Sequence, residues 1–109
     1  MGFWYDPPIT AEERRQDEIT RYVRAVFGLT AVFGSEGGSF DVYSALSFDP
    51  NLDDADCAGV AIRIWHGEEG EERAFIPFSK LATVQSVEDA RAILLASDLP
   101  PRLHAAVVG

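Results

Sequence analysis

The sequence has little cysteine and no long apolar run. Its one cysteine, Cys57, excludes an internal disulfide and is typical of proteins in a reducing compartment. No segment approaches the roughly 20 consecutive apolar residues that a membrane-spanning helix needs. The N-terminus also lacks the basic and apolar regions of a secretory signal. We therefore expect a cytoplasmic protein without a membrane span.

Positive charge is scarce as well. Nine Lys and Arg residues stand against eighteen Asp and Glu residues, which gives a formal net charge of −9. Proteins that bind nucleic acids or anionic membranes neutralise phosphates with clustered Lys and Arg. This balance argues against a nucleic-acid partner and against a membrane partner. An acidic surface mainly keeps a protein soluble, and it can also attract a basic partner.

Two capping-box spacings mark the expected helices. Thr10 stands three residues before Glu13, so a helix is expected over residues 10–27, before a glycine that ends it. Ser86 stands three residues before Asp89 and predicts a second helix, which a Pro-Pro pair ends.

Alternation of apolar and polar residues predicts four strands. Short connections between them favour an antiparallel meander with the helices packed on one face. The expected fold is therefore a two-layer α+β domain with a four-stranded antiparallel sheet and the order α-β-β-β-β-α. The expected strands are residues 29–33, 40–48, 58–66 and 72–78.

The chain length predicts a single domain that spans residues 1–109. Its two ends are apolar. Residues 1–9 form an arm rich in aromatic residues and proline, and residues 102–109 form a tail whose pattern fits either a short helix or a strand.

Two acidic runs flank the strand expected at 58–66. We expect both runs to lie in solvated loops, which leaves the strands free of charge. The runs are Asp49, Asp53, Asp54 and Asp56, and Glu68, Glu69, Glu71 and Glu72.

The first acidic run resembles the start of a calcium loop, because Asp49, Asn51 and Asp53 place oxygen ligands two residues apart. The pattern then fails: Asp54 stands where glycine is required, and Val60 where the bidentate glutamate is required. We expect a solvated turn, no bound metal and no cofactor.

Catalytic residues are equally hard to find. Cys57 and His66 lie at opposite ends of one expected strand, roughly 30 Å apart at about 3.3 Å per residue, so they cannot form a dyad. His104 could approach Cys57 in the fold, but the acidic surroundings of this cysteine disfavour a thiolate. No recognisable catalytic motif occurs, and we expect a protein that is not an enzyme.

Three groups of residues are candidates for binding a protein partner. Aromatic residues and Arg are the side chains that interfaces favour, and acidic loops suit a basic target. For each group, a purely structural role is the alternative: the N-terminal arm or the C-terminal tail could cover the sheet face within the monomer. The candidates are Tyr43, Arg63 and Trp65 on one sheet face, Phe3, Trp4 and Tyr5 in the arm, and Asp53, Asp54 and Asp56 in the loop.

These observations favour a small, acidic, non-enzymatic protein-interaction module from a prokaryote or its phage. Its most concrete version is an inhibitor of the immunity-protein, antitoxin or anti-defence kind, and a homodimer is also possible. The alternative is a ligand-binding or accessory-subunit domain, with a ligand between the sheet and the first helix. A small enzyme is the third choice. The rings expected to line a ligand site are Phe40, Phe48, Phe75 and Phe78.

Overall fold

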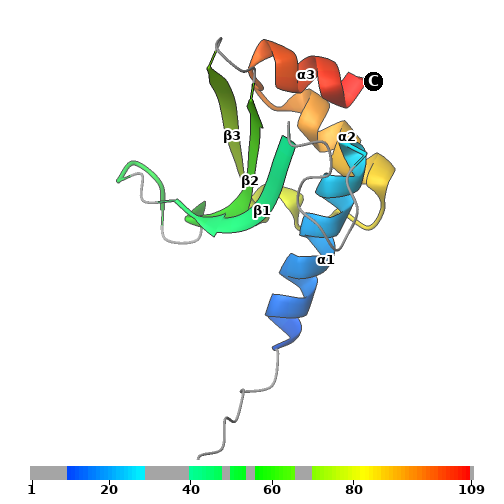
Figure 1. Cartoon of the computed structure of the whole chain (residues 1–109). Helices are drawn as coiled ribbons and strands as arrows, with labels where there is room; N and C mark the ends of the chain where they lie inside the picture. The colour runs from blue at the N-terminus through cyan, green and yellow to red at the C-terminus, as the bar shows by residue number, and fades with distance from the viewer. Residues whose placement is uncertain (1–9, 29–39, 48–49, 54–55, 66–69, 109) are drawn as a thin grey trace, which may run out of the picture.

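The computed structural model describes residues 10–28, 40–47, 50–53, 56–65 and 70–108. They form one antiparallel sheet and three α-helices (Figure 1). The elements, in chain order, are α1 (Ala11–Val26), β1 (Phe40–Leu46), β2 (Ala58–Trp65), β3 (Glu71–Pro77), the 3₁₀ turn η3 (Phe78–Leu81), α2 (Val87–Ala96) and α3 (Pro101–Val108).

The expectation of a four-stranded sheet with two helices is wrong for this part of the chain. The described residues hold three strands and three helices, so the mixed α+β class is correct but the order α-β-β-β-β-α is not. Residues 29–33, the first expected strand, lie outside the described residues. The ambiguous tail is helical, because a proline fits the first turn of α3 and its apolar residues recur at helical spacing.

The sheet is a meander with the order β1-β2-β3. Val42 pairs with Ile62, and Ile62 pairs with Ala74, so the three strands are in register across the sheet. β3 ends at Pro77, which has no N–H to donate to a ladder. Proline thus ends an edge strand.

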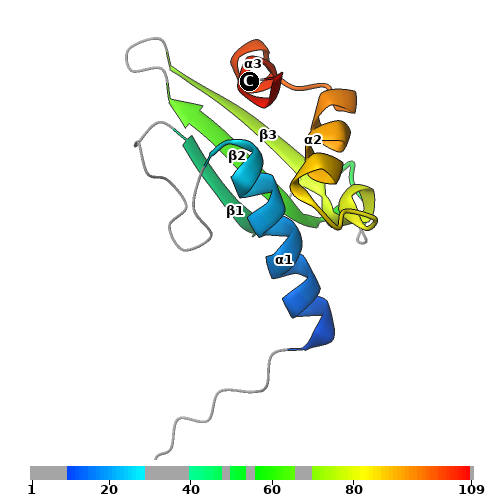
Figure 2. The ribbon, with the colours of Figure 1, turned by 90° about the vertical axis from the view of Figure 1, so that its right-hand side faces the viewer.

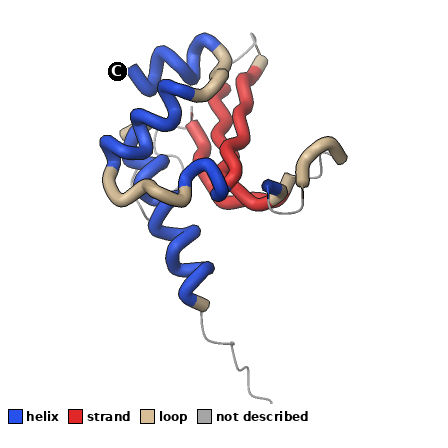
Figure 3. The backbone as a smooth tube through the Cα atoms, turned by 180° about the vertical axis from the view of Figure 1, so that it is seen from behind, coloured by secondary structure: helices blue, strands red, loops and turns tan. Residues whose placement is uncertain are grey.

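All three helices lie on one side of the sheet (Figures 1 and 3). Figure 2 shows α1 in front of the sheet and running in roughly the same direction as the strands, with α2 and α3 on the same side. The β1–β2 connection projects from the opposite side, at the end of the sheet far from α3 (Figure 1). The described helices contain none that is long and apolar enough to cross a membrane.

The core lies between the sheet and the helices. Alternate residues of β2 face it, because successive side chains of a strand point to opposite faces. Nine core side chains are completely buried, which leaves no exposed apolar surface at the centre of this layer. They are Val23, Val42, Val60, Leu81, Val84, Ala90, Leu94, Leu103 and Val107.

Both expected helix caps are present. Thr10 accepts a hydrogen bond from the Glu13 N–H at 3.0 Å, and Ser86 accepts one from the Asp89 N–H at 3.1 Å. The Asp89 carboxylate reaches back to the N–H of Gln85 at 2.9 Å, one residue earlier than the usual capping box. These contacts satisfy backbone donors that have no partner inside a helix.

The third helix is capped from the sheet. Glu72 Oε1 accepts the backbone N–H groups of Arg102 at 2.9 Å and Leu103 at 3.1 Å. Arg91 of α2 donates to the Val107 carbonyl at 3.4 Å, near the other end of α3. The short helix is therefore fixed at both ends by side chains of other elements.

We expected the acidic run that precedes and enters β3 to lie in a loop, and this expectation is wrong for two of its members. Glu71 and Glu72 are strand residues that make specific contacts, whereas Glu68 and Glu69 lie outside the described residues. Two neighbouring charged residues at a strand end can make contacts on opposite sides of the sheet, because successive side chains point to opposite faces.

Candidate protein-binding surface

The side of the sheet opposite the helices carries a cluster of aromatic and charged residues, which we call the open face. Residues that pair across the three strands share this face, since strand side chains alternate. No described helix covers it (Figure 1). Its principal members are Asp41 and Tyr43 on β1, Arg63 and Trp65 on β2, and Glu71, Arg73 and Phe75 on β3.

Arg63 is the centre of the open face. Its Nη2 donates to Asp41 Oδ2 at 2.9 Å, and its Nε lies 3.7 Å from Glu71 Oε2. Its guanidinium carbon lies 4.1 Å from the centroid of the Trp65 ring, which is cation–π geometry. The Nε atom is buried and makes no hydrogen bond within the described structure. Neighbours on two other strands and one aromatic ring therefore hold one guanidinium in place.

Arg73 completes the charge pattern. Its Nε and Nη2 both donate to Glu71 Oε1, at 3.0 and 2.5 Å. This hydrogen bond, together with the negative charge of Glu71, raises the pKa of Arg73 above its ordinary value. Two carboxylates, Asp41 and Glu71, thus balance two guanidinium groups, and the open face is close to neutral within a strongly acidic protein.

Aromatic side chains surround this ionic cluster. Tyr43 is 40% exposed and Trp65 is 44% exposed, although both lie on a regular sheet. Phe75 is half-buried, and its ring lies over Gly59, where a Cβ atom would come within 2.8 Å of it. A shallow groove of about 360 Å³ runs between Tyr43, Arg63 and Phe75. Tyr, Trp and Arg are enriched at the binding hot spots of protein interfaces.

The C-terminal tail does not cover the open face. It forms α3, whose Leu103 and Val107 are buried in the core on the other side of the sheet. The proposed anchors Phe3, Trp4 and Tyr5 lie outside the described residues. Of the two monomer segments that could shield Tyr43 and Trp65, the tail is thus excluded.

The acidic loop is only partly described. Asp53 is exposed, and its carbonyl accepts the Asp56 N–H at 2.8 Å. The Asp56 carboxylate accepts the Ser79 hydroxyl at 2.6 Å, so this residue ties the loop to η3. Asp49 and Asp54 lie outside the described residues, and Asn51 is exposed. Within the described part of the chain, no three His, Cys, Asp or Glu side chains gather as a metal site would require.

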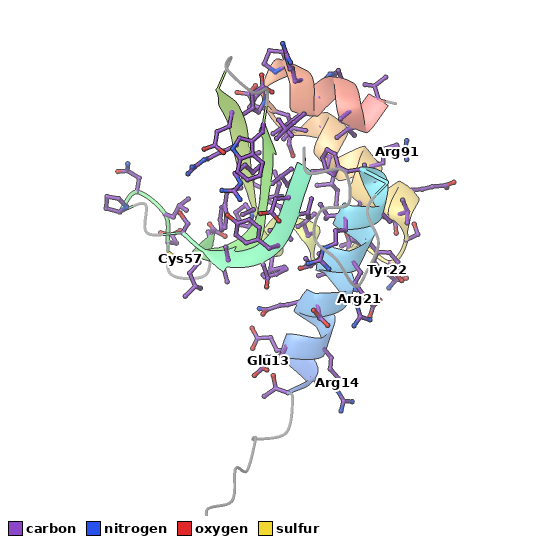
Figure 4. All side chains as sticks on the ribbon, in the orientation of Figure 1. Glu13, Arg14, Arg21, Tyr22, Cys57 and Arg91 are labelled. Atoms are coloured by element: carbon purple, nitrogen blue, oxygen red, sulfur yellow. The ribbon has the colours of Figure 1, made fainter. Side chains whose placement is uncertain are left out.

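The structure does not bring the candidate catalytic residues together. Cys57 lies at the end of the sheet where the β1–β2 connection projects, and α3, which carries His104, lies at the opposite end (Figure 4). The Cys57 thiol donates to the Asp53 carbonyl at 3.4 Å, which is a local structural contact. His66 lies outside the described residues.

Between the sheet and α1, core side chains such as Val23 and Val42 are completely buried, but a groove of about 410 Å³ opens beside α1 and is lined by Gln16, Ala58 and Phe78. Phe78 packs against that core, but Phe75 points to the open face, because its neighbour Ile76 occupies the helix side. Nothing is described of the Phe40 side chain or of Phe48. Three members of the open face are not among the candidates predicted from the sequence, and these are Glu71, Arg73 and Phe75. Alternation along β3 identifies them once Ile76 is assigned to the core.

No protein-family model, curated protein or solved structure matches this chain.

Proposed function

We propose that this protein is a non-enzymatic protein-binding module and that the open face contacts its partner. The observation that carries the proposal is the exposure of Tyr43 and Trp65 around a guanidinium that is already fixed in place. A side chain that is ordered before binding loses little conformational entropy when the partner arrives.

The charge balance of the open face indicates which kind of partner surface would fit it. Asp41 and Glu71 are already engaged by Arg63 and Arg73, so the face offers no surplus charge. A partner on this face would contribute a mainly apolar patch with a few hydrogen-bonding groups, and its binding would depend weakly on salt.

The inhibitor version of this function requires a different surface. An inhibitor of a basic site would use the acidic loop around Asp53, and its binding would weaken steeply as salt rises, because exposed charges are screened. Salt dependence therefore separates the two versions of the same proposed function.

The test compares matched variants in capture of partner protein from the native host. Trp65→Ala and Tyr43→Ala each remove an exposed ring from the open face, and Leu95→Ala removes an apolar side chain of similar exposure (41%) from α2. We expect the open-face variants to lose the partner and Leu95→Ala to retain it.

An Asp53/Asp54/Asp56→Asn variant tests the acidic loop in the same assay. If this variant alone loses the partner, and if capture weakens steeply as salt rises, the acidic loop and not the open face is the binding surface. Capture that survives all of these changes would refute both versions.

A further inference from the structure

β3 is an edge strand whose outward backbone groups can be identified. The Ser47 N–H donates to the Cys57 carbonyl at 2.6 Å, immediately beyond the pair of Leu46 and Ala58. Hydrogen-bonded pairs alternate along an antiparallel ladder. Gly59, Ala61 and Arg63 of β2 therefore direct their backbone groups to β1, and the residues between them direct theirs to β3.

The same alternation applies to β3. Val60 pairs with Ile76 and Ile62 pairs with Ala74, so Ile76 and Ala74 turn their N–H and C=O groups toward β2. Phe75, between these two, and Arg73, on the other side of Ala74, must direct their backbone groups away from the sheet. An added strand would pair with residues at this spacing of two.

The other edge of the sheet supports this assignment. Alternation places the Val42 carbonyl on the outer side of β1, and Arg24 Nε of α1 donates to it at 2.9 Å. In the described part of the chain, no equivalent donor or acceptor from another element reaches the outward groups of Arg73 and Phe75. One edge of the sheet is thus blocked by a side chain, and the other is open at two residues.

A groove of about 810 Å³ follows the open edge. Its wall on the β3 side includes both Phe75, from the open face, and Ile76, from the helix side. Consecutive residues that point to opposite faces can line one groove only along the strand edge. The far wall comes from the end of α2 and the connection to α3, through Ile93, Ala96, Leu99 and Pro100.

The groove also differs in charge from the rest of the protein. Lys80 and Asp98 face it with opposite charges, and Arg73 is already paired with Glu71, so the groove is close to neutral, whereas the whole chain carries a net charge of −9. From the open edge, the apolar far wall and this near-neutral lining, we infer that an extended, mainly apolar segment of a protein partner adds to β3 as a fourth strand.

A second copy of this chain fits the groove less well. Pairing of β3 with its own copy would bring two far walls to the same edge, and it would join two chains of net charge −9. A single extended segment requires space for one backbone only. The inference concerns a surface beyond the open face and does not depend on Tyr43 or Trp65.

The probe for this site is a phage-displayed library of random heptapeptides, selected on the full chain. We expect enrichment of sequences in which apolar residues alternate with polar ones. Binding of the enriched peptides should protect the Arg73 and Phe75 amides, which are outward in the free protein, from hydrogen exchange.

Two matched pairs of variants locate the binding. Phe75→Pro removes an outward N–H and blocks strand pairing, whereas Phe75→Ala removes the ring and keeps the N–H. Ala96→Tyr fills the groove, whereas Ala92→Tyr adds the same ring to an exposed position on the same helix that does not line it. We expect Ala96→Tyr to weaken peptide binding about tenfold or more, and Ala92→Tyr and Trp65→Ala to change it less than about threefold. Phe75→Pro should weaken binding about tenfold more than Phe75→Ala, which also takes a ring from the groove wall but keeps the backbone donor.

Several results would overturn the inference. The first is a selection that enriches no peptide. The second is equal peptide affinity of the Ala96→Tyr and Ala92→Tyr variants. The third is protection of the Arg73 and Phe75 amides from hydrogen exchange in the free protein. A wild-type dimer in which those amides are protected would assign the edge to a second copy instead. If Phe75→Pro does not fold, the Ala96 and Ala92 pair decides the question alone.

Discussion

Glu72 on β3 caps α3 by accepting a hydrogen bond from the Leu103 N–H at 3.1 Å. Leu103 lies 31 residues after Glu72 in the sequence. The same oxygen accepts the Arg102 N–H at 2.9 Å. Helices commonly take their N-cap from the residue that precedes them, but here Pro100 precedes α3 and offers no side-chain acceptor. A strand residue therefore supplies the cap.

Removal of this cap should destabilise the protein. We expect Glu72→Ala to lower the free energy of unfolding by about 1 kcal/mol, within the range of about 0.5–2 kcal/mol for lost N-caps. Urea denaturation followed by circular dichroism measures this difference. Asp53→Asn, at an exposed turn, is the control and should change the free energy little; equal effects of the two variants would argue against a capping role for Glu72.

Gly59 should tolerate no side chain. A Cβ atom at this position would lie 2.3 Å from the Ile76 carbonyl oxygen and 2.8 Å from the Phe75 ring. We expect Gly59→Ala to destabilise the protein by about 3 kcal/mol, the upper part of the range for overpacked sites. The double variant Gly59→Ala/Phe75→Ala should recover little of this loss, because the backbone oxygen cannot move aside; full recovery in a thermal melt would identify the ring as the whole obstacle.

Two arginines of α1 should differ in their effect on stability. Arg15 donates to the Ala82 carbonyl at 3.0 Å and to the Val84 carbonyl, and so ties α1 to the segment before α2. Arg21 pairs only with the exposed Asp17 on its own helix. We expect Arg15→Ala to cost about 1–2 kcal/mol of unfolding free energy and Arg21→Ala less than about 0.5 kcal/mol. Similar unfolding midpoints in urea would contradict this ranking.

Arg63 and Trp65 should be energetically coupled. In a double-mutant cycle with Arg63→Met and Trp65→Leu, we expect a coupling free energy of about 0.5–1 kcal/mol from the cation–π contact. Chemical denaturation of the four proteins gives this value. A cycle of Arg21→Met with Trp65→Leu serves as the control and should give none, since no contact joins Arg21 to this ring.

Most of the described fold follows from local sequence signals. Thr10 and Ser86 begin helices because each offers a side-chain oxygen to a backbone N–H three residues on. The alternation of Val60, Ile62 and Ile64 predicts which face of β2 is buried. On α1, Glu18 pairs with Arg15, three residues before it, at 3.3 Å, since residues three and four apart are neighbours on a helix.

The cross-element contacts could not be read from the sequence. The capping of α3 depends on where β3 lies in space, so the position of Glu72 in an acidic run does not predict its contact with Arg102. Tyr43, Arg63 and Trp65 were assigned to one face from alternation alone, and the structure places them there. The groove along β3 needs the position of Leu99 relative to the strand, which no periodicity encodes.

The start of β3 joins the two layers of the molecule. Glu71 holds Arg63 and Arg73 on one side of the sheet, and its neighbour Glu72 holds α3 on the other. Local opening of this strand end would release the guanidinium cluster and the third helix in a single event. We therefore expect the open face and the C-terminal helix to unfold as one unit, so that a ligand that stabilises Arg63 would slow hydrogen exchange in α3.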